Sequence, residues 1–247
     1  MKKVEYLIKY ANAQVGRPYW TGTYGQIADA ALLAYKRQQY PKSYPQPGDP
    51  AFTSQFGQKV HDCNGLVNGA RECDTPDSKP NKYPDPYYSV KGLYDACKTK
   101  GALTLGLSLL SGTLLFRNNF GHVGIYDGEG NVIHAKGHKY GVVKEKYNVY
   151  DWQYFGQLEC CFDYGTATTE ISIKQPATIR KGSKGYEVKV WQQILLGLEF
   201  DLGEAGVDGI FGTKTLAATK AFQKFKGLDV DGIVGKFTWT AGLNTLA

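Results

Sequence analysis

The sequence predicts an α+β domain with N-terminal helices and an antiparallel sheet, followed by a small all-α domain of three helices. Two observations lead to this prediction. Apolar residues recur at helical spacing in the first hundred residues, whereas after Gly112 they form short runs separated by glycine and polar turns. Near the C-terminus, a glycine-rich turn pattern occurs twice, each time just before a helical pattern.

The first hundred residues contain three helical patterns, separated by loops rich in glycine and proline. The predicted helices are 4–15, which Gly16 ends, 27–39, and 89–100, which Ser89 caps. The predicted loops are 16–22, 41–60 and about 75–88.

Four short β-type runs follow, at 113–116, 122–126, 131–135 and 141–144. Residues 127–131, Asp-Gly-Glu-Gly-Asn, are a strong turn signal, so strands 122–126 and 132–136 should form a hairpin. An odd loop would pair Tyr126 with Val132 and place His134 diagonal to His122 on one face. An even loop would put the two histidines on opposite faces.

The α+β domain is predicted to span 1–165, a Thr-rich linker 166–178, and the three-helix domain 179–247. In that last domain Val207-Asp208-Gly209-Ile210 recurs 23 residues later as Val230-Asp231-Gly232-Ile233, with helices predicted at 213–226 and 235–243. Asp229-x-Asp231-Gly232 has part of a calcium-loop pattern, but the closing Glu is absent, so we interpret it as a turn.

The net charge of +6 is spread over the chain, with 19 basic against 15 acidic residues in 1–165 and 10 against 8 in 166–247. No dense basic run occurs, so we expect no nucleic-acid partner, and no apolar window approaches twenty residues, so we expect no membrane insertion. The mild positive charge suits an anionic polymer such as a bacterial wall, or serves ordinary solubility. The first ten residues resemble an amphipathic helix and not a signal peptide, which favours retention in the cytoplasm.

Among the five cysteines, Cys63 has distinctive neighbours, and the other four are interpreted as small buried apolar residues. The chain has no Cys-x-x-Cys zinc pattern. Cys63, Leu66, Val67 and Ala70 share one face of a helix that begins at Asp62 or Cys63. A thiol in the first turn faces unpaired backbone N–H groups, which should lower its pKa. The alternative is an inert buried cysteine.

If the hairpin has the odd loop, the two histidines give this thiol a catalytic setting. His122 would take the thiol proton and later protonate a leaving amine, and His134 would fix the tautomer of His122. His61 and His138 are assigned no role. His134 and His138 are four residues apart, but Gly137 and the β pattern argue against a helical metal pair, so no metal site is predicted.

Residues 62–66 (Asp-Cys-Asn-Gly-Leu), 121–126 (Gly-His-Val-Gly-Ile-Tyr) and 133–135 (Ile-His-Ala) resemble the motifs of papain-like cell-wall endopeptidases of the NlpC type. Gly16-x-Pro18-Tyr19 is similar to that family's stretch before the nucleophile. The resemblance implies a papain-like fold for 1–165, with Cys63 as nucleophile, His122 as base and His134 as third polar residue. It also implies that Asp62 and Tyr19 lie near the amino end of the substrate peptide. No cofactor is implied.

Two features depart from the family pattern. Asn64 stands where the family has Ser, which makes it a candidate substrate contact, and the segment between Tyr19 and Cys63 is longer than usual. That longer segment could reshape the cleft and alter the choice of bond.

Residues 178–247 resemble the small three-helix peptidoglycan-binding domain, through 180–185 (Arg-Lys-Gly-Ser-Lys-Gly), Trp191-Gln192, both Val-Asp-Gly-Ile copies and Thr238-Trp239. The whole chain therefore resembles a phage endolysin that stays in the host cytoplasm until its release to the cell wall. The resemblance implies bacterial peptidoglycan as partner and cleavage of stem-peptide amides, commonly between D-glutamate and the diamino acid. The alternatives are an N-acetylmuramoyl-L-alanine amidase with the same thiol machinery, a catalytically inactive wall-binding protein, and a zinc hydrolase that uses the histidines.

Overall fold

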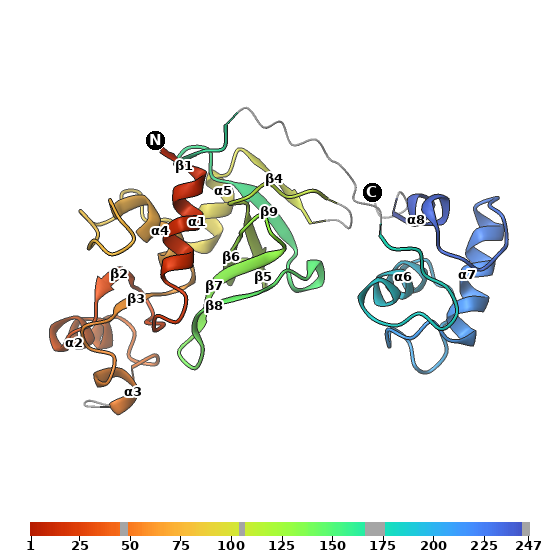
Figure 1. Cartoon of the computed structure of the whole chain (residues 1–247). Coiled ribbons are helices and arrows are strands. Elements are labelled where there is room, and N and C mark those ends of the chain that lie inside the picture. The colour runs from red at the N-terminus through yellow and green to blue at the C-terminus, as the bar shows by residue number, and fades with distance from the viewer. Residues whose placement is uncertain (45–48, 104–106, 166–175, 244–247) are drawn as a thin grey trace. The chain divides into compact units, whose positions relative to one another are not determined.

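The computed structural model describes residues 1–44, 49–103, 107–165 and 176–243, and the chain divides into two compact units (Figure 1). The larger unit consists mainly of residues up to Glu170 and the smaller mainly of residues from Ile171 onward, and each is described by itself. The predicted linker 166–178 lies outside the described residues, except for 176–178.

The centre of the larger unit is a six-stranded antiparallel sheet in the order β4-β9-β5-β6-β7-β8. Its strands are β4 (Thr99–Ala102), β5 (Leu114–Arg117), β6 (His122–Tyr126), β7 (Asn131–Gly137), β8 (Gly141–Lys146) and β9 (Tyr154–Gln157). A short parallel pair, β1 (Lys2–Lys3) with β10 (Phe162–Asp163), joins the two ends of this unit. The mixed α and β composition and the antiparallel sheet agree with the predicted fold class.

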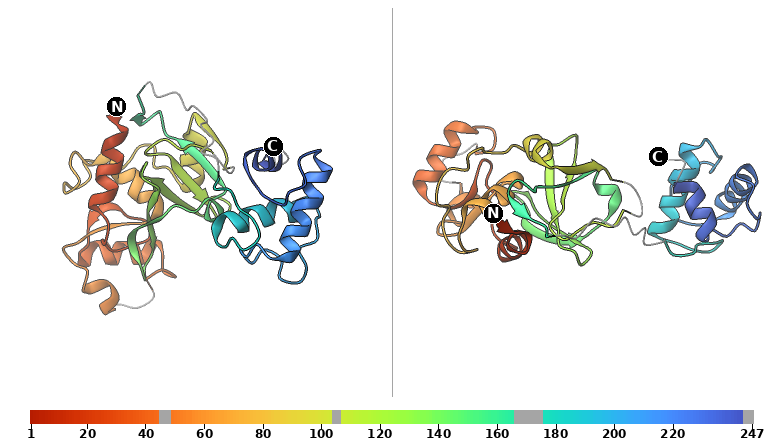
Figure 2. Two further views of the ribbon diagram at one scale, coloured as in Figure 1. Left: turned by 45° about the vertical axis from the view of Figure 1, so that its right-hand side comes forward. Right: turned by 90° about the horizontal axis from the view of Figure 1, so that it is seen from above.

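Helices α1 (Val4–Ala13), α4 (Cys63–Glu72) and α5 (Val90–Ala96) belong to this unit, and α1 and α4 lie together on one face of the sheet (Figures 1 and 2). The strands alternate, so Val123, Ile125 and Ile133 enter the core beneath these helices. Leu115, Val132 and Trp152 form a second, smaller cluster. The motifs that contain Cys63, His122 and His134 therefore lie on elements that pack directly against one another.

The segment between Tyr19 and Cys63 has a small core of its own, away from the main sheet (Figure 1). It contains β2 (Tyr24–Ile27), α2 (Ala30–Gln39), α3 (Pro50–Thr53) and β3 (Lys59–His61), and β2 pairs with β3 in an antiparallel ribbon. Its buried apolar residues are Trp20, Ala28, Leu33, Tyr44, Phe52 and Val60. The longer segment is thus a folded part of the unit.

Two predictions for this segment were wrong. The helix predicted from Ile27 begins at Ala30, because the Asp29 side chain accepts from the Leu32 N–H at 2.7 Å and Ile27 pairs in β2. The stretch 41–60, predicted to be irregular, contains α3 and β3. Asp49 caps α3, with a proline in its first turn.

The helix predicted at 89–100 is also shorter than expected. Ser89 caps it as predicted, accepting from the Gly92 N–H at 3.0 Å, but α5 ends at Ala96. The N–H groups of Lys98 and Thr99 instead donate to the carboxylate of Glu159, each at 2.9 Å, and the chain continues into β4. A contact from 60 residues away therefore ends this helix.

The smaller unit contains α6 (Tyr186–Gly197), α7 (Thr213–Phe225) and α8 (Lys236–Leu243), close to the predicted three helices. Trp191 is its central residue, with ring centroids 5.0 Å from Phe222 and 5.4 Å from Trp239. The indole N–H of Trp191 donates to the Thr219 hydroxyl at 2.7 Å, so this polar group is satisfied within the core.

The two Val-Asp-Gly-Ile copies have the same hydrogen-bond network, each organised by a buried glutamine at the equivalent place in a helix. Its side-chain NH2 group, which has two N–H donors, lies within hydrogen-bond distance of the Asp carboxylate, the Ile carbonyl and a following Thr hydroxyl, and its oxygen accepts from the Gly N–H. The residues are Gln192 with Asp208, Gly209, Ile210 and Thr215, and Gln223 with Asp231, Gly232, Ile233 and Thr238. In both copies the Asp is a turn residue.

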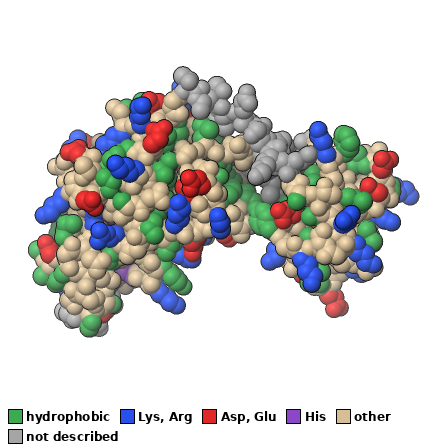
Figure 3. Space-filling model, in the orientation of Figure 1, with side chains coloured by type: hydrophobic (Ala, Val, Ile, Leu, Met, Phe, Trp, Pro, Cys, Tyr) green, Lys and Arg blue, Asp and Glu red, His purple; other side chains and the backbone are tan. Residues whose placement is uncertain are grey.

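On the face seen in Figure 3, basic and acidic side chains are interspersed over each unit. Within the ranges that the structure describes, no helix has both the length and the apolar character needed to cross a bilayer.

Candidate active site

Cys63 is the first residue of α4, and Asp62 fixes the start of that helix. One carboxylate oxygen of Asp62 accepts from the Gly65 N–H at 2.6 Å, and the other accepts from the Gly22 N–H at 2.7 Å. The same side chain therefore caps the helix and ties it to the loop before β2. The backbone N–H groups of Cys63 and Asn64 stay oriented toward the sulfur.

The thiol itself is buried, with Cys63 only 8% exposed. Burial first, and then the charge of Asp62, raise the pKa of the Cys63 thiol to about 12, against hydrogen bonds from the N–H groups of Cys63, Asn64 and Val123. The expectation of a lowered pKa was wrong, because burial and a neighbouring carboxylate outweigh the helix N-terminus. At neutral pH the resting site holds a thiol, which needs a base to become a nucleophile.

The Val123 N–H beside this sulfur belongs to β6, and the preceding residue of that strand is His122. The hairpin has the odd loop, since Tyr126 pairs with Val132 and Ile125 with Ile133. His122 and His134 therefore share one face, as predicted, and the His122 Nε2 atom lies 2.8 Å from the His134 Nδ1 atom. The sulfur thus lies beside the backbone of the residue that directly follows His122 in β6.

A third residue extends this pair. The His134 Nε2 atom lies 3.1 Å from the Glu145 Oε2 atom, and the other oxygen of Glu145 accepts from Lys136 at 2.6 Å. A carboxylate only accepts, so His134 donates through Nε2 and its Nδ1 accepts the Nε2–H of His122. The Nδ1 atom of His122 is then unprotonated. This is the tautomer that a general base requires.

Burial, with His134 and Arg117 adding to it, lowers the pKa of His122 to about 3. His122 is therefore neutral throughout the physiological range. The pKa of His134 is also lowered by burial, against the neighbouring Glu145.

Trp152 packs against both imidazoles, which the sequence did not indicate. Its indole is stacked on His122 with centroids 5.9 Å apart and meets His134 edge-on at 5.7 Å. Gly124 lies on the strand between the two histidines without leaving open space there. A Cβ atom on Gly124 would lie 2.5 Å from Val132 and 2.7 Å from Trp152, so these side chains fill the space. The glycine permits close packing that holds both rings.

Tyr19 and Asn64, which are predicted with Asp62 to contact the substrate, both lie near Cys63. Burial first, and then electrostatic interaction with Cys63 and Asp62, raises the pKa of Tyr19, and its ring packs with centroids 5.1 Å from that of His138. The Asn64 amide donates to the Tyr87 hydroxyl at 3.1 Å and to the Tyr88 carbonyl at 2.8 Å. Both residues border the site, and their contact with substrate stays a prediction.

Two residues of the site were missed from the sequence. Glu145 pairs with Val132 across β7 and β8, on the face that carries His134. The predicted strand ended at Lys144, so continuing its alternation by one residue could have found Glu145. Trp152 follows the 3-10 turn Val149–Asp151, and no local pattern assigns it to the histidines.

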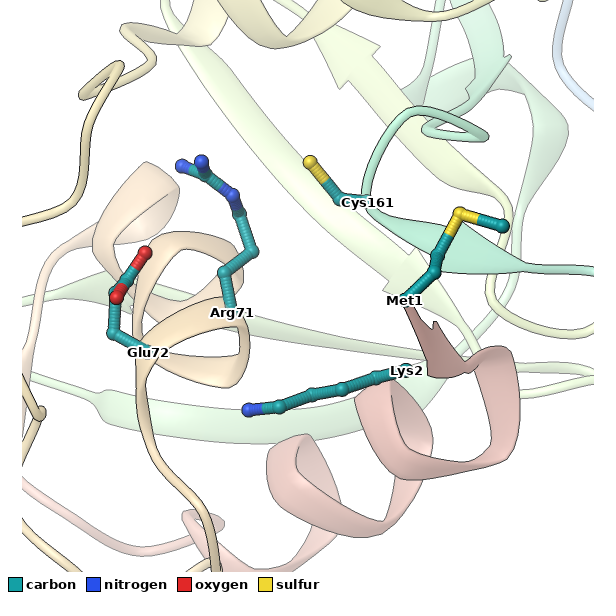
Figure 4. A pocket seen from close by; sticks show the side chains of 5 residues that line it. All are labelled: Met1, Lys2, Arg71, Glu72 and Cys161. Carbon is teal, nitrogen blue, oxygen red and sulfur yellow. The ribbon is translucent and has the colours of Figure 1, made fainter.

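A hollow of about 360 Å³ lies at the opposite end of α4 from Cys63 and is not part of this site. Figure 4 shows its lining residues, Met1, Lys2, Arg71, Glu72 and Cys161. Cys160 is exposed and Cys161 half-buried, with their sulfurs 3.5 Å apart. The interpretation of these two cysteines as small buried apolar residues was wrong, because they lie in the turn before β10.

No group of three or more His, Cys, Asp or Glu side chains able to hold a metal ion occurs among the residues with described positions. The side chains of the site that could bind a metal instead form hydrogen bonds with one another, since His134 lies between His122 and Glu145.

Comparison with known proteins places the smaller unit in a family. Residues 184–241 match the family model described as putative peptidoglycan binding domain. The chain is 42% identical over 74 residues to the N-acetylmuramoyl-L-alanine amidase CwlL of Bacillus licheniformis, which covers 30% of this chain and 21% of that protein. It spans 8–28% of the length of four curated relatives, CwlL among them.

Two solved structures are similar over different shares of the chain. The N-terminal domain of SleB is 33% identical, covering 30% of this chain and 97% of that structure, with a TM-score of 0.28. The peptidoglycan hydrolase RipB of Mycobacterium tuberculosis is 22% identical, covering 63% of this chain and 64% of that structure, with a TM-score of 0.38. Residues 184–241 in the tail thus match the putative peptidoglycan binding domain, and the front unit carries the three motifs that resemble those of NlpC-type endopeptidases.

Proposed function

We propose that this protein is a cysteine-dependent peptidoglycan hydrolase that cleaves a stem-peptide amide between D-glutamate and the diamino acid. One observation carries the proposal: a buried thiol at a helix start lies beside β6, where the His122–His134–Glu145 relay begins. The resemblance of the three motifs to NlpC-type endopeptidases supports the choice of bond.

In the proposed reaction, His122 Nδ1 takes the Cys63 proton as the sulfur attacks the amide carbonyl. The resulting oxyanion is stabilised by backbone N–H groups at the start of α4, an effect of about 3 kcal/mol per donor. The C–N bond then breaks and His122 gives its proton to the leaving amine. Water, deprotonated by His122, hydrolyses the thioester, which releases the carboxylic acid and restores the thiol.

The His122–His134–Glu145 relay stabilises His122 whenever it carries the transferred proton. As the His122 imidazolium forms, His134 accepts its Nε2–H, and the negative Glu145 lies one hydrogen bond further out. This placement stabilises a cation that burial otherwise disfavours. Proton transfer is therefore coupled to attack, and no stable thiolate is needed beforehand.

The test is digestion of purified peptidoglycan sacculi with the full-length protein and with Cys63→Ala, followed by mass spectrometry of the released fragments. We expect wild type to release peptide fragments that end at D-glutamate, and the alanine variant to release none. Bare glycan with intact stems would identify an amidase. Undiminished lysis by Cys63→Ala would exclude the thiol mechanism.

We further propose that the tail attaches the enzyme to the wall. Its family description supports this role, and its described residues carry no comparable thiol or histidine group. Deletion of residues 166–247 should weaken sedimentation with cell walls and leave cleavage of a soluble stem peptide largely intact. Equal sedimentation of the truncated and full-length proteins would rule out this role.

A further inference from the structure

Two neighbouring cysteines, Cys160 and Cys161, form a second group of thiols that the proposed mechanism does not use. Their sulfur atoms lie 3.5 Å apart, so both side chains leave the turn on the same side. Cys160 is exposed and Cys161 is half-buried, and neither takes part in a disulfide. The other three cysteines of the chain are buried. A reagent in solution therefore meets this pair before any other thiol of the protein.

The backbone of the turn holds the two thiols in this arrangement. The Leu158 carbonyl accepts from the N–H groups of Cys161 and Phe162, each at 3.0 Å. On one side of the pair, the Glu159 carboxylate accepts from two backbone N–H groups where the chain enters β4. On the other side, Phe162 begins β10, which pairs with β1. Both ends of the turn are thus fixed, which favours contact between the two sulfur atoms.

A disulfide between these residues needs only a small movement of the side chains. The sulfur atoms would approach from 3.5 Å to the covalent distance of about 2.05 Å. The Cα atoms of neighbouring residues are about 3.8 Å apart, which is shorter than the span of about 4.4–6.8 Å in ordinary disulfides. The bond would therefore be strained, and strained disulfides are easily reduced. A pair of this kind can be oxidised and reduced reversibly.

The two thiols differ in accessibility, which assigns them different steps. Cys160 is exposed, so it can attack a disulfide in solution. Burial raises the pKa of Cys161 to about 11, and Arg71, which lines the same hollow (Figure 4), acts in the opposite direction. Cys161 is thus a poor nucleophile toward a reagent in solution. Its attack on the sulfur of Cys160 is intramolecular, however, and gains from the proximity of the two atoms.

We propose that Cys160 and Cys161 are a reversible exchange site for low-molecular-weight disulfides, with Cys160 as the attacking thiol and Cys161 as the resolving thiol. The Cys160 thiolate attacks one sulfur of the reagent RSSR, which forms a mixed disulfide and releases RS⁻. Cys161 then attacks the Cys160 sulfur, forms the Cys160–Cys161 disulfide and expels the second RS⁻. The two RS⁻ groups take up the two thiol protons, so two thiols are oxidised and RSSR is reduced to two RSH. The buried Cys63 takes no part and stays reduced.

The test treats the reduced full-length protein with oxidised glutathione and follows the products by intact mass and peptide mapping. The wild type should lose two hydrogen atoms and carry no glutathione, with Cys160 and Cys161 protected from later alkylation in denaturant. Cys161→Ser should instead accumulate a mixed disulfide at Cys160, because the resolving thiol is absent. Cys160→Ser should react at least about tenfold more slowly than the wild type. Cys97→Ser, the same change at a buried cysteine, should behave as the wild type.

Dithiothreitol should return the oxidised wild type to five free thiols. Glutathione that stays on the wild-type protein would overturn the inference, because Cys161 would then not resolve the mixed disulfide. Oxidation of Cys63 as fast as that of Cys160 would also overturn it, since exposure would then not select the site, and so would the absence of any reaction. Because every readout is a mass or a thiol count, none of these outcomes depends on whether the protein is a peptidoglycan hydrolase.

Discussion

Both units contain a buried network of polar side chains, and the two networks differ in how they end. In the tail, Gln192 and Gln223 each satisfy a turn completely, with every donor and acceptor of the amide used. In the front unit, the Glu145–His134–His122 relay ends at the Nδ1 atom of His122, one residue before the Val123 N–H that faces the Cys63 thiol. A network whose polar groups are all hydrogen-bonded internally stabilises the fold, which we call a closed network. A network that ends at an unprotonated nitrogen, which we call an open end, can pass a proton to a substrate.

Substitution at the open end should have the largest effect. His122→Gln removes the base, and we expect kcat/KM on a soluble stem peptide to fall about 10²–10⁴-fold. The fold should persist, because Trp152 and Val132 still pack around the site. Activity assays with circular dichroism check both parts. Retention of more than a tenth of the activity would mean that another group is the base.

Substitution in the closed network should instead affect stability alone. Gln192→Leu leaves the Gly209 N–H and the Ile210 carbonyl without their partner, which should cost about 2–4 kcal/mol in the unfolding of the tail. Gln193→Leu, at the adjacent exposed position, is the matched control and should change little. Calorimetry of the full-length protein measures both. A loss of soluble-peptide cleavage in Gln192→Leu would contradict the division of roles.

A fall in pH should change the free energy of unfolding of the two units differently, because all four histidines lie in the front unit. Burial lowers the pKa values of His61 and His122 to about 3, below their unfolded value of 6.5. The unfolded chain thus binds more protons between these values, and stability is lost as the pH falls through this range. From pH 6.5 to 4.5 the loss should be about 2 kcal/mol per histidine.

Asp62 acts in the opposite direction, because burial raises its pKa to about 6 and the folded state then binds the extra proton. The net effect is still a fall in front-unit stability on acidification, with little change in the tail above pH 4.5. Calorimetric transitions of the full-length protein between pH 7 and 4.5 measure this. Parallel shifts of both transitions would show that the buried histidines do not determine the acid response.

The parts of the site that the sequence could predict are those fixed by local chemistry. The five-residue turn 127–131 sets an odd loop, which places both histidines on one face, and Asp62 is a good helix cap next to Cys63. These signals lie within a few residues of the positions they determine. The positions of Cys63 at a helix start and of His122 and His134 on one face were predicted in this way, and their catalytic roles stay a prediction.

The parts that could not be predicted depend on contacts between distant segments. The helix after Ser89 ends early because Glu159 accepts from Lys98 and Thr99, some 60 residues earlier in the chain. The thiol pKa depends on how deeply α4 packs against β6, which raises it even though a helix N-terminus alone would lower it. Trp152 reaches the histidines only through the strand order of the folded sheet.

Glu145, at the outer end of the relay, should have the smallest effect on activity. Its side chain is 44% exposed, so solvent weakens the electrostatic interaction between its carboxylate and His134. Glu145→Gln keeps an oxygen that can accept from His134 but removes the charge that stabilises the imidazolium, and we expect kcat/KM to fall about tenfold. Lys136→Met is the matched control, since it breaks the ion pair at 2.6 Å while leaving the carboxylate in place. If both variants lose activity equally, the ion pair positions the strand and the charge does not act on His122; if neither loses any, the relay ends at His134.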